Sequence, residues 1–158
     1  MRERTVTISS AGKTFSVTGW KIGWVCAEPR LVAAVRTVKQ FLTYVSGAPF
    51  QPAVALVLPL AEKLAPAAQL QAQRDQFCAG LADLGLDVVV PEATYFATVD
   101  VGADALAFCR ELPLTKGVVA IPSSVFYDSG AGDGYVRFAF CKRPAVLADA
   151  LERLGRTA

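Results

Sequence analysis

The chain of 158 residues contains no histidine. This absence excludes the Ser–His and Cys–His pairs of many nucleophilic enzymes and removes the commonest metal ligand of proteins. If the chain takes part in catalysis, Lys, Tyr, Asp or Glu must therefore carry out the proton transfers.

Closely spaced cysteine pairs are lacking as well. The four cysteines stand singly in apolar segments, at Cys26, Cys78, Cys109 and Cys141. A zinc site or a dithiol redox centre needs cysteines only a few residues apart. We therefore predict buried free thiols, because unpaired cysteine behaves as a small apolar residue.

Long apolar runs and a strong charge of one sign are also missing. Prolines or charged residues interrupt every apolar stretch before the roughly 20 residues of a membrane helix, and residues 1–8 lack the apolar core of a secretory signal. The 16 basic and 14 acidic side chains leave a net charge of +2, far from the basic field that non-specific nucleic-acid binding needs. We expect a cytoplasmic protein whose partners are small molecules or proteins, without membrane or nucleic acid.

The first part of the chain reads as strands followed by helices. Residues 5–9 alternate like a short strand that leads into a small, flexible loop at 10–14, and residues 20–27 form a second strand. Pro29 stands where a helix begins, and apolar residues recur at helical spacing up to Gly47. A second helix over 52–64 is apolar nearly all round, which is typical of a buried helix or of a subunit interface.

The second part alternates helices and strands. After Pro66 an amphipathic helix places Leu70, Phe77, Leu81 and Leu84 on one stripe and stops at Gly85. Strands are predicted at 87–90, 95–101, 117–121 and 135–140, and helices at 103–112 and 144–156. This order indicates an α/β unit with helices on one face of its sheet. We divide the chain into a first part (1–65), a connecting helix (66–85) and a small α/β domain (86–158).

Residues 9–24, SSAGKTFSVTGWKIGW, carry the most chemical information. This segment resembles the lysine-bearing segment of fold-type-I, class I/II aminotransferases that use pyridoxal 5′-phosphate (PLP), in the branch of the kynurenine, glutamine, methionine and N-succinyldiaminopimelate enzymes. The resemblance implies that Lys13 forms the Schiff base with PLP and that Ser10 and Lys21 bind its phosphate. It also implies the fold: the end of the large PLP-binding domain, over 1–65, followed by the small carboxyl-terminal α/β domain.

The residue types suit these roles. A lysine with a solution pKa of about 10.4 becomes a good nucleophile when desolvation or a neighbouring cation lowers that pKa. Its amine can then move a proton at the substrate α-carbon. Ser10 offers a hydroxyl donor and Lys21 a compact positive charge for a phosphate. The alternatives are a solvated loop lysine at 13, a strand-edge charge at 21, and a serine that binds only nearby backbone.

A second segment, GYVRFAFC at 134–141, places Arg137 inside an apolar strand. Burying an arginine is costly unless a carboxylate pairs with it, so Arg137 is a candidate anion-binding residue. The resemblance implies that Arg137 binds the substrate α-carboxylate through two parallel hydrogen bonds. The alternative is an arginine that faces solvent or pairs with Asp133 or Asp128.

Two aromatic residues complete the candidate site. Phe126 lies in IPSSVFY at 121–127, which resembles the family segment at the mouth of the substrate site, and it either contacts the substrate side chain or belongs to the core. Tyr44 falls where the kynurenine branch places an aromatic side chain that reaches the neighbouring subunit. The resemblance therefore also implies a homodimer.

Taken together, the resemblance implies an aminotransferase that moves an amino group from an L-amino acid, such as N-succinyldiaminopimelate or kynurenine, to a 2-oxo acid. A carbon–sulfur β-lyase of the same fold and a non-catalytic binding or dimerisation module are the alternatives. The resemblance accounts for less than half of a complete family member, without the glycine-rich turn that holds the phosphate or the Asp that pairs with the pyridinium nitrogen. We therefore expect little or no activity from the chain alone.

Overall fold

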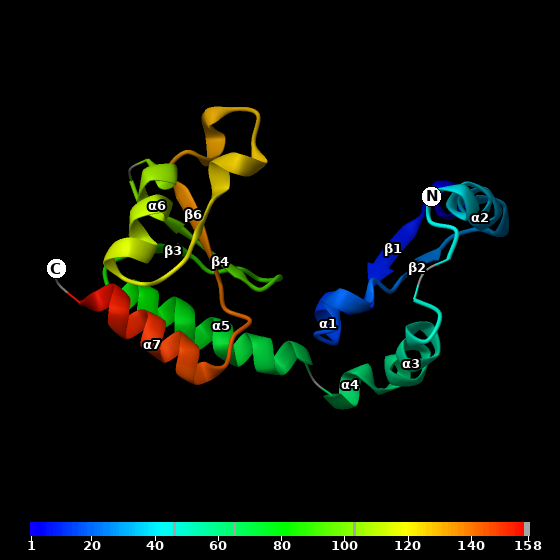
Figure 1. Ribbon diagram of the computed structural model, residues 1–158, viewed down its shortest axis with the longest axis horizontal. Helices are drawn as coiled ribbons and strands as arrows, with labels where there is room; N and C mark the ends of the chain where they lie inside the picture. The colour runs from blue at the N-terminus through cyan, green and yellow to red at the C-terminus, as the bar shows by residue number, and fades with distance from the viewer. Residues whose placement is uncertain (46, 65, 103, 157–158) are drawn as a thin grey trace. The chain divides into compact units, whose positions relative to one another are not determined.

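The computed structural model describes residues 1–45, 47–64, 66–102 and 104–156. The chain divides into two compact units, Met1–Ala67 and Ala68–Ala158, and each unit mixes helices with a small sheet (Figure 1). This confirms the α/β class that the sequence predicts. Within the described ranges no single helix is both long and apolar enough to cross a membrane, although the helical run 50–64 and the helix at 66–83 reach that length and composition when taken together.

The first unit contains an antiparallel hairpin. Strands β1 (Thr7–Ser10) and β2 (Gly23–Cys26) pair so that Ser10 lies opposite Gly23. A Cβ atom at Gly23 would lie 2.7 Å from the carbonyl oxygen of Ser9, so this close approach of the two strands requires glycine.

The strand predicted over 20–27 is shorter than expected. Residues Thr18–Trp20 form a 3₁₀ turn, η2, and Lys21 then adopts a left-handed backbone conformation with φ 56°. A residue in that conformation cannot continue an extended strand, so β2 begins only at Gly23.

Helices make up the rest of the first unit. A 3₁₀ turn, η1 (Arg2–Arg4), opens the chain, and α2 (Pro29–Leu42) begins at the proline as predicted. The helix predicted over 52–64 is three pieces, α3 (Phe50–Val57), η3 (Leu58–Leu60) and α4 (Ala61–Leu64). The interruption lies at Pro59, which has no backbone N–H to donate.

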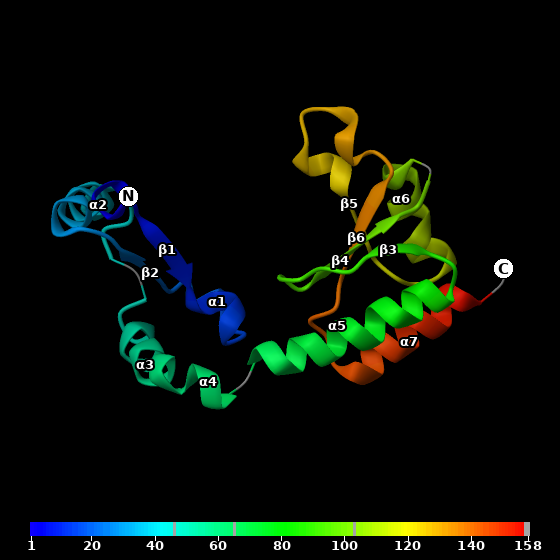
Figure 2. The same ribbon diagram turned by 180° about the vertical axis from the view of Figure 1, so that it is seen from behind.

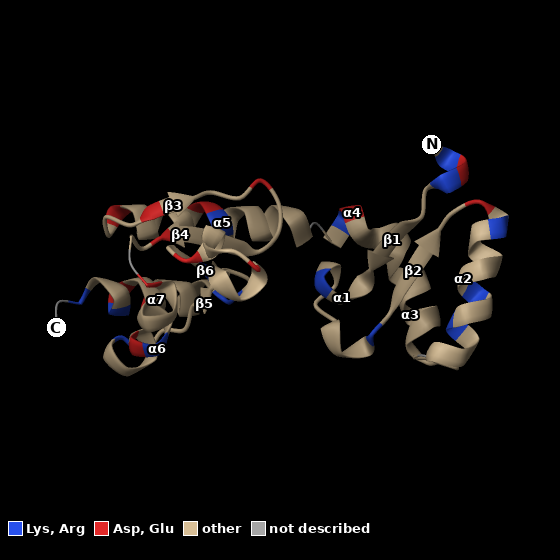
Figure 3. Cartoon of the chain, turned by 90° about the horizontal axis from the view of Figure 1, so that it is seen from above, with Lys and Arg blue, Asp and Glu red and all other residues tan. Residues whose placement is uncertain are grey.

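Few side chains of the first unit are buried. Among its described residues, Ala11, Ile22 and Val54 form the only buried apolar cluster, and α2 contributes no buried residue. Basic residues recur along α2 (Figure 3), while Phe41 and Leu42 at its end are 81% and 77% exposed. An apolar helix face of this kind is typical of an interaction surface.

The second unit is built on a four-stranded antiparallel sheet (Figure 2). Its strands are β3 (Asp87–Val89), β4 (Phe96–Asp100), β5 (Ile121–Pro122) and β6 (Tyr135–Ala139), in the spatial order β3-β4-β6-β5. The prediction of a strand over 117–121 is wrong for residues 117–120, because Gly117 is left-handed and Val118 and Ala120 are buried in the core without pairing to a strand.

Three helices cover one face of this sheet. They are α5 (Pro66–Asp83), α6 (Ala105–Thr115) and α7 (Pro144–Gly155); the first residue predicted for the second of these helices, Ala103, lies outside the described residues. α5 ends where Gly85, at φ 80°, reverses the chain. Short 3₁₀ turns, η4 (Ser123–Phe126) and η5 (Gly130–Gly132), lie between β5 and β6.

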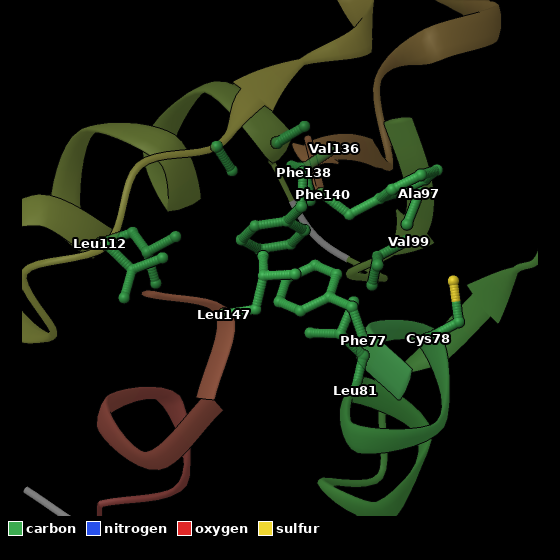
Figure 4. Packing of buried hydrophobic residues seen from close by; sticks show 13 residues of the cluster. Phe77, Cys78, Leu81, Ala97, Val99, Leu112, Val136, Phe138, Phe140 and Leu147 are labelled. Carbon is green, nitrogen blue, oxygen red and sulfur yellow. The ribbon is translucent and has the colours of Figure 1, made fainter. Parts of the chain in front are cut away.

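The core of the second unit lies between the helices and the sheet (Figure 4). Phe77 and Leu81 from α5 and Leu147 from α7 meet the sheet residues Val99 and Phe138, all of them at most 3% exposed. The rings of Phe77 and Phe138 pack edge to face, with centroids 6.2 Å apart. The predicted stripe on α5 is therefore confirmed at Phe77 and Leu81.

All four cysteines are free thiols. Burial raises the pKa of the Cys78 thiol, an effect that the nearby Arg74 opposes, and burial also raises the pKa of the half-buried Cys109. The prediction of buried thiols is wrong for Cys26 and Cys141, which are exposed because one ends β2 and the other follows β6.

Candidate functional site

Lys13 lies on a single helical turn, α1 (Ala11–Thr14), where the sequence predicts a loop. Ser10 caps this turn, because its Oγ accepts a hydrogen bond of 3.1 Å from the backbone N–H of Gly12. The N–H of Ala11 donates to the carbonyl oxygen of Ile22 at 3.0 Å. Both contacts satisfy N–H groups that a helix start leaves without partners, so a turn too short to be stable by itself becomes fixed.

The segment after α1 anchors the same turn. The backbone N–H of Val17 and the hydroxyl of Thr18 both donate to the carbonyl oxygen of Gly12, at 2.9 and 3.2 Å. A Cβ atom on Gly12 would lie 3.3 Å from both Ser10 Oγ and Thr18 Cα. The backbone under Lys13 is thus closely packed, while the Lys13 side chain itself is exposed.

Lys21 is linked to the α1 turn through the next residue, Ile22. Its left-handed backbone, at φ 56° and ψ 40°, costs a residue other than glycine about 1 kcal/mol or more. The next carbonyl, that of Ile22, accepts hydrogen bonds from the Ser10 hydroxyl at 3.5 Å and from Ala11. Ser10 and the α1 turn that carries Lys13 are therefore hydrogen-bonded to the residue that directly follows Lys21, and Lys21 itself has a strained backbone.

The donor set of this motif fits a phosphorylated aldehyde. The Ser10 hydroxyl binds backbone, as one of the alternatives predicts, but its bond to Ile22 has the length of a weak hydrogen bond, so the hydroxyl can turn to a phosphate oxygen. Lys13 and Lys21 both expose their side chains. The meeting of all three at one anion stays a prediction, since the two described cavities, of about 540 and 230 Å³, lie in the second unit.

Arg137 occupies the middle of β6, opposite Thr98 of β4 and Ile121 of β5. Its neighbours Val136 and Phe138 are buried under the helices. Because side chains alternate along a strand, Arg137 projects from the other face of the sheet.

Two aromatic rings lie against the Arg137 guanidinium. Its central carbon is 3.8 Å from the ring centroid of Phe126 and 4.4 Å from that of Phe96. The structure thus brings Arg137 and Phe126 together, as members of one cluster. Phe96 was not among the residues predicted from the sequence, although it begins a strand whose alternate residues are buried.

Among the described residues, no carboxylate neutralises the Arg137 guanidinium. Within the described ranges Arg137 forms no ion pair, so the alternative of a pair with Asp133 or Asp128 is wrong. Its Nε is buried without a hydrogen-bond partner. A half-buried cation of this kind is costly to keep, and an anionic ligand would remove the cost.

Tyr44 lies just beyond α2 in the first unit. Its side chain is 90% exposed, and its backbone is left-handed with φ 57°. It extends the exposed apolar surface at the end of α2, where Phe41 and Leu42 also lie. No described contact within the unit holds the ring, which is compatible with a role toward a neighbouring subunit.

Comparisons with known proteins show the family of this chain. The family model of aminotransferase class I and II matches residues 1–154. A probable N-succinyldiaminopimelate aminotransferase of Mycobacterium tuberculosis is 47% identical, with 98% of this chain and 43% of the relative aligned. A methionine aminotransferase of Escherichia coli is 37% identical, with 98% and 42% aligned, and a kynurenine–oxoglutarate transaminase of Dictyostelium discoideum is 33% identical, with the same two shares.

Solved structures give the same result. The N-succinyldiaminopimelate aminotransferase structure from M. tuberculosis superposes with a TM-score of 0.91 at 48% identity. The superposition covers 98% of this chain and 42% of the M. tuberculosis chain. The E. coli structure described as having a methionine aminotransferase function reaches 0.90 at 36% identity, with the same coverage. The chain thus spans somewhat less than half of the length of these relatives.

Proposed function

Since the chain belongs to the aminotransferase class I and II family, we propose that it takes part in PLP-dependent amino transfer from an L-amino acid to a 2-oxo acid. The observation that carries the proposal is the exposed Lys13 on a helical turn whose backbone is fixed on both sides by hydrogen bonds. A reacting amine is most effective when its support is rigid.

Each residue of the lysine motif has a separate task. PLP, when bound, supplies the electron sink that weakens bonds at the substrate α-carbon. Lys13 holds the cofactor covalently and, once released from it, moves a proton at the α-carbon. Ser10 donates its hydroxyl to the phosphate, and Lys21 neutralises part of the phosphate charge. The strain at Lys21 is typical of a residue that is kept for its function.

Arg137 binds the α-carboxylate in this proposal. Its guanidinium has no carboxylate partner among the described residues, and a planar fork of donors matches the two oxygens of a carboxylate. Amino-acid donor and 2-oxo-acid acceptor both carry this group, so one arginine serves both halves of the reaction.

The donor proposed is N-succinyldiaminopimelate or a kynurenine-type amino acid, because relatives with these names align with nearly the whole chain. A carbon–sulfur β-lyase would use the same lysine and arginine, and a non-catalytic binding module would use neither. The relatives are more than twice as long as this chain, so the activity belongs to a larger assembly of residues than those described.

Product analysis separates these functions. The chain is assayed alone and fused behind the amino-terminal part of the M. tuberculosis relative, each saturated with PLP. We expect the fusion to form L-glutamate from 2-oxoglutarate and one of the candidate donors, and the chain alone to form little or none. Ammonia and pyruvate released from a cysteine conjugate without any acceptor would favour the lyase, and no reaction of either kind would favour the binding module.

We further propose that the protein is a homodimer and that the end of α2 lies in the interface. Phe41, Leu42 and Tyr44 expose 77–90% of their surface there, which is unfavourable for an isolated chain in water. Phe41→Asp should shift the sedimentation coefficient of the fusion protein toward that of a monomer, because a carboxylate would be buried without a partner. Leu114→Asp is the control, since Leu114 is 87% exposed in the second unit, and an unchanged dimer in Phe41→Asp would contradict the assignment.

A further inference from the structure

The face of the second sheet opposite its helices holds a cation in contact with two aromatic rings. β4 and β6 pair so that Phe96 lies opposite Ala139, two residues from Arg137 along the same face. Diagonal neighbours at this spacing are within reach of aromatic and long side chains. Phe126 approaches from the end of η4, a segment outside the sheet. The register of the sheet and the η4 turn together create the cluster.

The nitrogens of the Arg137 guanidinium differ in their surroundings. Nε is shielded from solvent and has no hydrogen-bond partner, whereas the two terminal nitrogens are not among the buried atoms that lack partners. No ion pair occupies them in the described part of the chain. The terminal nitrogens are therefore the edge at which an anion can bind.

We infer that Phe96 and Phe126 form an aromatic clamp that fixes the Arg137 guanidinium, so that its two terminal nitrogens receive the carboxylate of an amino acid or 2-oxo acid. The inference rests on the proposed function for the identity of the ligand. In this arrangement Phe96 is a positioning residue that acts through Arg137, and Phe126 has the same task in addition to any contact with the substrate.

The two rings affect the Arg137 guanidinium in ways that simple packing does not. A free arginine side chain loses much rotamer freedom when it binds a ligand, and two rings in contact with the guanidinium reduce that freedom beforehand. The rings also displace water from the guanidinium faces without competing for its N–H donors. An arginine with fewer waters and a fixed plane attracts a carboxylate more strongly than a solvated one.

Pyruvate binding tests the clamp on the 158-residue chain without cofactor. The probe is the ¹⁵N–¹H signal of Arg137 Nε, followed during titration with sodium pyruvate against sodium chloride at equal ionic strength. In the wild type we expect slow exchange of this proton with water and a pyruvate-specific shift. Phe96→Leu should weaken pyruvate binding about fivefold and speed the proton exchange.

Matched variants distinguish positioning from packing. Phe96→Tyr keeps the ring and should restore wild-type affinity, and Tyr127→Leu, at an exposed aromatic residue next to Phe126, should leave it unchanged. Unaltered affinity in Phe96→Leu, or equal loss in Phe96→Tyr and Phe96→Leu, would overturn the inference. Because the titration needs neither PLP nor Lys13, a failure of the proposed function at Lys13 leaves this result independent.

Discussion

Lys13→Ala is expected to abolish covalent capture of PLP and to lower amino transfer by the fusion protein roughly a thousandfold. The alanine removes the amine that holds the cofactor and moves the proton, while α1 should persist because its contacts come from backbone groups and from Ser10 and Thr18. The measurement is mass spectrometry of the chain after incubation with PLP and reduction with borohydride, which locates the added mass at a residue.

Two further lysine variants show whether PLP reacts specifically with Lys13. Lys13→Arg keeps the positive charge but has no primary amine, so it should fail in the same way as Lys13→Ala. Lys63→Ala changes another exposed lysine of the first unit, on α4, and should leave the labelling of Lys13 intact. Equal labelling of Lys13 and Lys63 in the wild type would mean that PLP reacts with any accessible amine, and Lys13 would lose its assigned role.

Sequence periodicity predicted the helices that carry a continuous apolar stripe. α7 is an example, because Leu147, Leu151 and Leu154 recur on one face and all pack against the core. A proline at the first turn fixed the start of α2 and of α7. In such segments the local signal and the tertiary packing agree, so the residues alone are informative.

Prediction failed where contacts distant in the sequence decide the conformation. Residues 11–14 contain no apolar period, and they become helical because Ile22 and the segment at 17–18 bind their backbone. Residues 117–120 have the composition of a strand, yet they pair with no strand. Val118 and Ala120 are buried in the core, whereas Val119 is exposed. Composition predicts that a residue such as Val118 is buried, and it does not predict whether its backbone joins a sheet.

The candidate site likewise contains residues that the sequence predicted and one residue that it did not. Lys13, Ser10 and Arg137 were predicted by their resemblance to a family segment, and their local chemistry supports that choice. Phe96 escaped notice because its relation to Arg137 depends on the register of β4 against β6. A register is set by turns and by the buried face of the whole sheet, which a single strand sequence does not contain.

A substitution in the core beneath this sheet is expected to destabilise the second unit most. Phe138→Ala should lower its free energy of unfolding by about 3–5 kcal/mol, because it leaves a cavity in a close-packed core. Phe138 is 2% exposed, and an alanine in its place cannot make the edge-to-face contact with Phe77. The free energy of unfolding of a native protein is typically about 5–15 kcal/mol, so a loss of this size leaves the unit marginally folded.

The thiol of Cys78 reports this loss within the same unit. It is 3% exposed in the folded chain, and burial raises its pKa, so it reacts with a thiol reagent chiefly after unfolding. Urea should therefore expose Cys78 at a lower concentration in Phe138→Ala than in the wild type. Leu114→Ala, at a residue that is 87% exposed, should change the free energy by less than about 0.5 kcal/mol. An equal midpoint for all three proteins would mean that Phe138 does not stabilise the sheet on which Arg137 is held.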